Sequence, residues 1–112
     1  SKTIMAGLNC ETPSLGAWDL LKNGTNYVLR ISDDYSKKAM RELYYPQGSD
    51  NRIISGESGA AGLGGLLAIL KESKIKSIKE DLKINNSTNI LFINSEGDTD
   101  KEVFSEIINS NI

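Results

Sequence analysis

The chain has 112 residues, a formal net charge of −2 and 25% charged side chains. That length suffices for one domain at most, and the near-balance of charge argues against a nucleic-acid-binding surface. The sequence contains no histidine and a single cysteine, so histidine-based acid–base chemistry, histidine metal sites and an internal disulfide are excluded.

Short apolar runs alternate along the chain with helical patterns. The predicted elements, in chain order, are a glycine-interrupted apolar entry segment (3–8), a loop (11–16), a short helix (17–22), a strand (27–31), a helix (32–44), a strand (53–55), a small-residue helix (58–72), an amphipathic helix (77–83), a turn (85–88), a strand (89–94) and a closing helix (101–108). Strands that alternate with helices predict an α/β fold, here a three-layer αβα fragment with a short parallel sheet.

A sheet of three strands would leave its edges exposed, and the very apolar helix around 63–70 needs cover on more than one side. We therefore expect the chain to be part of a larger domain. The chain begins with Ser1 rather than methionine, which suggests a processed or excised piece.

The stretch from Ile53 to Gly65 is the most informative part of the sequence. A β-branched run ends at Ser55 and Gly56, and a helix rich in glycine and alanine follows. Such a stretch lets the backbone approach a ligand or another element closely, so ligand binding and simple packing are both possible. Glu57 lies where a helix would begin, and a carboxylate there is favoured by the macrodipole. Neither a dinucleotide fingerprint nor a P-loop is present.

A second signal follows the predicted strand 89–94, where Ser95 and Glu96 lead into Gly97 and Asp98. In open α/β sheets, ligands bind just beyond the carboxyl ends of the strands. The tips at 55–57 and 94–96 are therefore predicted to share one edge and to face one crevice. The alternative is a polar turn in which Asp98 or Thr99 caps the last helix.

Three segments together resemble a known family: Thr-Ile-Met-Ala-Gly-Leu (3–8), Ser-Gly-Glu-Ser-Gly-Ala-Ala-Gly (55–62) and Asn-Ser-Glu-Gly-Asp-Thr-Asp (94–100). The chain resembles the C-terminal part of fold type II pyridoxal-phosphate enzymes, which share the fold of the tryptophan-synthase β-subunit, and looks closest to the diaminopropionate ammonia-lyases. The resemblance covers essentially the whole chain. It implies that 1–112 is a single C-terminal segment of a catalytic domain whose N-terminal portion is absent.

The resemblance also implies roles for four residues. Ser95 matches the residue that hydrogen-bonds the pyridine nitrogen of the cofactor, and Glu57 matches a glutamate near the ring. Ala6 and Gly7 match a segment that passes close to the cofactor. Met5-Ala6 stands where dehydratases often carry Ala-Asp, which favours the lyase.

No catalytic residue is expected in this chain, because the Schiff-base lysine of such enzymes lies in the N-terminal half. The expected reaction of the longer protein is the elimination of ammonia from 2,3-diaminopropionate to give pyruvate. The resemblance further implies a small amino-acid substrate and a homodimer, and we expect a cytoplasmic protein. The alternatives are a fragment of a serine or threonine dehydratase-like enzyme and a non-catalytic α/β module that binds a partner.

Three expectations concern features without a predicted functional role. Cys10 is expected to be a small buried apolar residue. No metal site is expected, and no apolar run is long enough to span a membrane.

Overall fold

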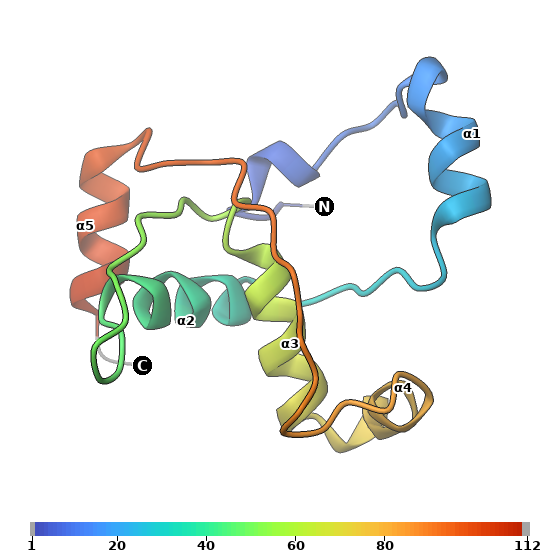
Figure 1. The fold of residues 1–112 in the computed structure, drawn as a ribbon. Coiled ribbons are helices and arrows are strands. Elements are labelled where there is room, and N and C mark those ends of the chain that lie inside the picture. The colour runs from blue at the N-terminus through green and yellow to red at the C-terminus, as the bar shows by residue number, and fades with distance from the viewer. Residues whose placement is uncertain (1, 111–112) are drawn as a thin grey trace.

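The computed structural model describes residues 2–110, and about half of the chain is helical (Figure 1). Long extended segments join the helices. The elements, in chain order, are η1 (Ala6–Leu8), α1 (Leu15–Gly24), α2 (Asp33–Tyr44), α3 (Ala61–Lys71), η2 (Ser73–Ile75), α4 (Lys76–Asp81) and α5 (Lys101–Asn109).

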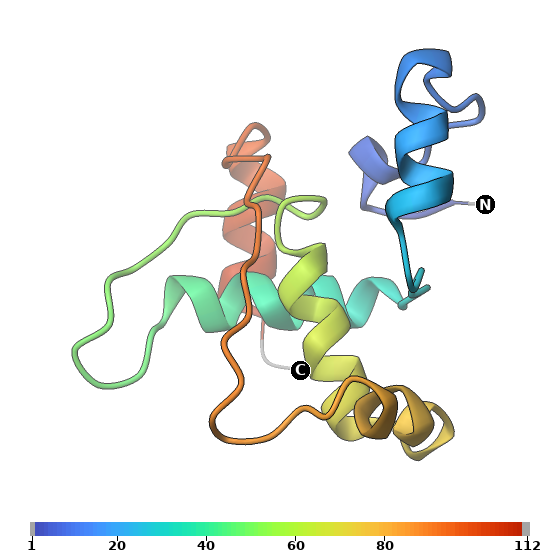
Figure 2. The same cartoon turned by 45° about the vertical axis from the view of Figure 1, so that its right-hand side comes forward.

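The helices α2, α3 and α5 form the core, with α2 in contact with both of the others (Figure 2). The core side chains recur at helical spacing on one face of each helix, as an amphipathic pattern requires. The buried cluster consists of Ala39, Met40, Ala60, Phe104, Ile107 and Ile108. Burial of this stripe is what holds the three helices together.

Local signals account for where these helices begin and how they cross. Asp33 and Asp34 occupy the first turn of α2, where negative charge is favoured. Asp100 caps α5, and its Oδ1 accepts from the backbone N–H of Val103 at 3.0 Å. A Cβ on Gly64 would lie 3.0 Å from the carbonyl oxygen of Tyr35, so a glycine there permits the close crossing of α3 on α2. The helix cap predicted at Asp98 or Thr99 is thus provided by Asp100.

The prediction of a parallel sheet is wrong. Residues 2–110 contain no assigned strand, so the three-layer αβα fragment with a parallel sheet is not what this chain forms. The segments 27–31, 53–55 and 89–94 do run without helical structure, as their apolar patterns predict. A strand, however, needs a neighbouring strand to satisfy its N–H and C=O groups, and that partner is not fixed by the local sequence. The closest approach to pairing is one bond from the Gly56 N–H to the Glu96 carbonyl at 2.9 Å.

The helix α1 stands apart from the core in both views and exposes large apolar side chains, among them Leu15 and Leu20 (Figures 1 and 2). Cys10, in the segment before α1, is exposed, so its predicted burial is wrong. Between residues 2 and 110, no helix is long and apolar enough to cross a membrane.

Candidate functional site

Three segments that are far apart in the sequence meet beside the start of α3. They are η1, the 55–59 loop and the 94–97 loop. The Gly7 N–H donates to Ser58 Oγ at 3.0 Å, and the Gly56 N–H donates to the Glu96 carbonyl at 2.9 Å. The two predicted tips are therefore adjacent, although no sheet edge brings them together.

A carboxylate from one tip holds the backbone of the other. Glu96 Oε2 accepts from the N–H of Ser58 at 2.5 Å and from that of Gly59 at 3.1 Å. These N–H groups belong to the turn that leads into α3, where free donors and the helix dipole favour an anion. The sequence suggested Glu57 for this position, and the structure places Glu96 there instead.

The side chain of Asn94 makes a second clamp between the same loops. Its Oδ1 accepts from Ser55 Oγ at 2.9 Å and from the Glu96 N–H at 3.3 Å. Its Nδ2 donates to the carbonyl of Ile54 at 2.9 Å. Because Ser55 is buried, the bond to its hydroxyl is shielded from water. Asn94 and Glu96 thus fix the chain on either side of Ser95.

The glycines of this region lie against the protein's own atoms. A Cβ on Gly56 would come within 2.6 Å of the Glu96 side chain, and one on Gly59 within 2.8 Å of Ser55 Oγ. Farther along, a Cβ on Gly62 would lie 3.2 Å from the Phe92 ring. The close backbone approach predicted from the glycine-rich stretch is present, and at these positions it serves internal packing.

The four predicted site residues gather around this junction. Ser95 is exposed, and its hydroxyl makes no hydrogen bond to another residue in the range 2–110. Glu57 is half-buried, and its carbonyl accepts from the hydroxyl of Ser36 on α2. Ala6 and Gly7 are exposed on η1. Within the described residues, no cluster of three potential metal-ligating side chains occurs.

The sequence analysis predicted no role for the side chains of Asn94 and Glu96, which hold the junction together. Glu96 and Ser58 are 38 positions apart, so no local pattern links them. One signal in the sequence could have pointed to this contact. A carboxylate, Glu96, follows one apolar run (89–94), and the start of a helix rich in small residues follows another (53–55).

Comparison with solved structures shows which class of protein this chain resembles. The crystal structure of an Escherichia coli lyase in complex with an aminoacrylate–PLP azomethine reaction intermediate superposes with a TM-score of 0.86 at 41% identity, covering 96% of this chain and 28% of that one. The apo form of the same enzyme gives a TM-score of 0.77 at 38% identity, over 86% of this chain and 26% of that one. Both structures are of diaminopropionate ammonia-lyase.

The curated relatives agree. Diaminopropionate ammonia-lyase of Escherichia coli strain K12 is 42% identical over 106 residues, which are 95% of this chain and 27% of the relative. The Salmonella typhimurium protein of the same name is 34% identical over 107 residues, 95% of this chain and 26% of its own length. No family model matches the chain. The chain is homologous to diaminopropionate ammonia-lyase over 95% of its length and corresponds to the C-terminal ~27% of that enzyme.

One contact ties the junction to the core and can be tested on this chain. The hydroxyl of Ser36, which is fully buried on α2, donates to the Glu57 carbonyl. We expect Ser36→Ala to lower the free energy of unfolding by about 1–3 kcal/mol, because the carbonyl of the half-buried Glu57 loses the donor that the fully buried Ser36 hydroxyl supplies. Urea unfolding followed by far-UV circular dichroism measures this, with Ser87→Ala in an exposed loop as the control. Equal stability of the two variants would show that the contact does not hold the loop.

Proposed function

We propose that this chain is the C-terminal segment of the catalytic domain of a pyridoxal-phosphate-dependent ammonia-lyase, which eliminates ammonia from 2,3-diaminopropionate to give pyruvate. The chain spans about 27% of the length of the curated relatives that it matches, so the activity belongs to a longer protein. The observation that carries the proposal is the meeting of η1, the 55–59 loop and the 94–97 loop in a chain 42% identical to the Escherichia coli lyase.

The residues of the junction fit one wall of a pyridoxal-phosphate site. When bound, this cofactor acts as an electron sink that makes an amino acid's α-proton easier to remove. Ser95 offers an exposed hydroxyl with no competing partner among the described residues, which suits a donor to the pyridine nitrogen. A neutral hydroxyl would leave that nitrogen largely unprotonated. Asn94 and Glu96 would hold Ser95 in place through their bonds to the 54–59 backbone.

Glu57, Ala6 and Gly7 would complete this wall. Glu57 stands on the same loop as Ser58, whose hydroxyl accepts from the Gly7 N–H, so both segments are fixed relative to each other. The small side chains at positions 6 and 7 leave the η1 backbone accessible. We assign Glu57 to orienting the ring side of the pocket, and Ala6 and Gly7 to close backbone approach.

A chimeric enzyme tests the activity and the substrate. This chain replaces the homologous C-terminal region of the Escherichia coli lyase, and pyruvate and ammonia are measured with 2,3-diaminopropionate, serine and threonine. We expect the highest kcat/KM with 2,3-diaminopropionate. A preference for serine or threonine would assign the chain to a dehydratase, and a folded, cofactor-loaded chimera without activity on any of the three would refute the proposal.

The 112-residue chain alone is expected to be inactive. A lysine amine must be held at the cofactor aldehyde, and Lys22, Lys37 and Lys71 all lie on helices outside the junction. We expect borohydride reduction after incubation with pyridoxal phosphate to label no single lysine stoichiometrically, as peptide mass spectrometry can check. One uniquely labelled lysine together with turnover would contradict this expectation.

The longer protein is proposed to be a cytoplasmic homodimer. The single cysteine supports a compartment in which disulfides are not needed. The apolar surface of α1, where Leu15 and Leu20 are exposed, supports further protein contacts. Sedimentation of the chimera measures its oligomeric state, and a monomer at micromolar concentration would remove the dimer from the proposal.

A further inference from the structure

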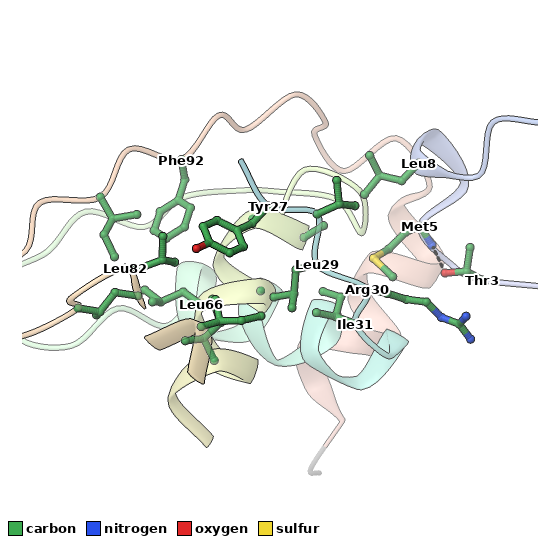
Figure 3. Close-up of a pocket in the computed structure, with 18 of the residues that line it drawn as sticks. Thr3, Met5, Leu8, Tyr27, Leu29, Arg30, Ile31, Leu66, Leu82 and Phe92 are labelled. Carbon is green, nitrogen blue, oxygen red and sulfur yellow. Dashed lines mark hydrogen bonds between the residues drawn. The ribbon is translucent and has the colours of Figure 1, made fainter. Parts of the chain in front are cut away.

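The segment before η1 is tied to the first turn of α2 by the carboxylate of Asp33. Asp33 Oδ1 accepts from the Thr3 hydroxyl, and Asp33 Oδ2 accepts from the Ile4 N–H at 3.2 Å. The Met5 N–H in turn donates to Thr3 Oγ1 at 3.2 Å (Figure 3). One carboxylate and one hydroxyl thus satisfy two successive backbone N–H groups immediately before η1 begins at Ala6.

A second anchor lies three positions later on α2, and residues at that spacing are neighbours on the surface of a helix. Ser36 is fully buried there, and its hydroxyl donates to the carbonyl of Glu57. The Gly7 N–H donates to Ser58 Oγ at 3.0 Å, so η1 and the 55–59 loop are also bonded to each other. The beginning of α2 therefore holds both of these segments of the junction in place.

The η1 segment has little room to move without losing these contacts. A Cβ on Gly7 would lie 3.0 Å from Ser58 Oγ, so the two segments approach as closely as a glycine permits. Met5 is 7% exposed, whereas Ala6 and Gly7 are exposed on η1. Burial thus holds the start of the segment, and the exposed part that is assigned to the cofactor depends on hydrogen bonds for its position.

We propose that Asp33 is a positioning residue of the cofactor site, on which it acts through the segment that leads into η1. Its bonds to that segment set where the backbone of Ala6 and Gly7 stands relative to the cofactor. The inference rests on the proposed function, which assigns these two residues to the wall of a pyridoxal-phosphate site. A misplacement of about 1 Å, caused by a substitution far from the chemistry, can cost about 100-fold in rate. Loss of the anchor should therefore change the kinetics and not only the stability.

The Asp33→Ala substitution in the chimeric lyase tests this proposal, with Asp34→Ala as the matched control. Asp34 lies in the same first turn of α2 and is exposed, and its carboxylate bonds to no other residue from 2 to 110. We expect Asp33→Ala to lower kcat per bound cofactor at least about tenfold, with a smaller change in KM. It should also alter the visible circular dichroism of the cofactor, and Asp34→Ala should change none of these quantities. Wild-type kcat and circular dichroism in Asp33→Ala would overturn the proposal.

Hydrogen exchange of the chimera without cofactor gives a readout that does not depend on activity. We expect the amides of Ile4, Met5 and Gly7 to exchange at least about tenfold faster in Asp33→Ala than in Asp34→Ala, because the segment opens more often. Equal exchange in the two variants contradicts the proposal. A chimera that binds cofactor without lyase activity refutes the proposed function instead, and faster exchange with an altered circular dichroism would still sustain the role of Asp33.

Thr3→Val tests the same contact with a smaller change, because it removes the hydroxyl and retains the bond between Asp33 and the Ile4 N–H. We expect it to lower kcat less than Asp33→Ala does. The effects of the two substitutions should be less than multiplicative in the double variant, since both residues act through one contact. Multiplicative effects would show that they act independently and would contradict the proposal. If Asp33→Ala yields no folded chimera, wild-type kcat and circular dichroism in Thr3→Val overturn it.

Discussion

Replacing Glu96 with alanine is expected to lower the free energy of unfolding by about 2–3 kcal/mol. The substitution removes the carboxylate that accepts from the N–H groups of Ser58 and Gly59. Hydrogen bonds to a charged acceptor are stronger than neutral ones, and the Gly59 N–H is buried, so water replaces the lost acceptor only in part. Equilibrium unfolding in urea, followed by far-UV circular dichroism, gives this quantity.

The control for this variant is Glu106→Ala, because Glu106 is an exposed carboxylate on α5. We expect that control to change the unfolding free energy by less than about 0.5 kcal/mol. If Glu96→Ala and Glu106→Ala are equally stable, the carboxylate does not hold the two loops together. Glu96→Gln retains an acceptor and loses the charge, so it is expected to fall between the wild type and the alanine variant.

Phe104→Ala is expected to have the largest effect on stability, about 3–5 kcal/mol. Phe104 is 7% exposed in the cluster of α2, α3 and α5, and its ring meets Tyr44 edge-to-face with centroids 5.7 Å apart. The truncation loses apolar burial, leaves a cavity and removes the aromatic contact. Leu15→Ala is the control, because Leu15 is 91% exposed on α1. A comparable loss for both variants would contradict the placement of Phe104 in the core.

The helices could be predicted because their signals are local. Periodic apolar residues such as Ala39 and Met40 identify α2, and the acidic residues at its start place its beginning. The segments 27–31 and 89–94 were identified as extended by the same kind of local pattern. Their assembly into a sheet could not be predicted for this chain alone, because pairing depends on a partner elsewhere in the polypeptide.

The same distinction between local and long-range signals applies to the candidate site. Motif resemblance pointed to Ser95, Glu57, Ala6 and Gly7, and the structure gathers their three segments at one junction. The contacts that make the junction were not predictable, since Glu96 and Asn94 act across 37 to 40 positions in the sequence. Local reasoning predicted that the carboxylate of Glu57 would supply the negative charge at the start of the helix. In the structure, the carboxylate of Glu96, on another loop, lies there instead.

The most direct test of whether this junction is a wall of a pyridoxal-phosphate site is the Ser95→Ala substitution in the chimeric lyase. The two quantities to measure are the absorbance spectrum of the cofactor and the turnover of 2,3-diaminopropionate. Losing one hydroxyl contact at the ring is expected to shift the spectrum and to lower kcat at least about tenfold. The cost to folding should be small, because Ser95 is exposed and bonds to no described residue. Ser87→Ala, in an exposed loop away from the junction, is the matched control and should leave both unchanged. If Ser95→Ala also leaves the spectrum and the turnover unchanged, Ser95 is a turn residue and the junction is not a cofactor wall.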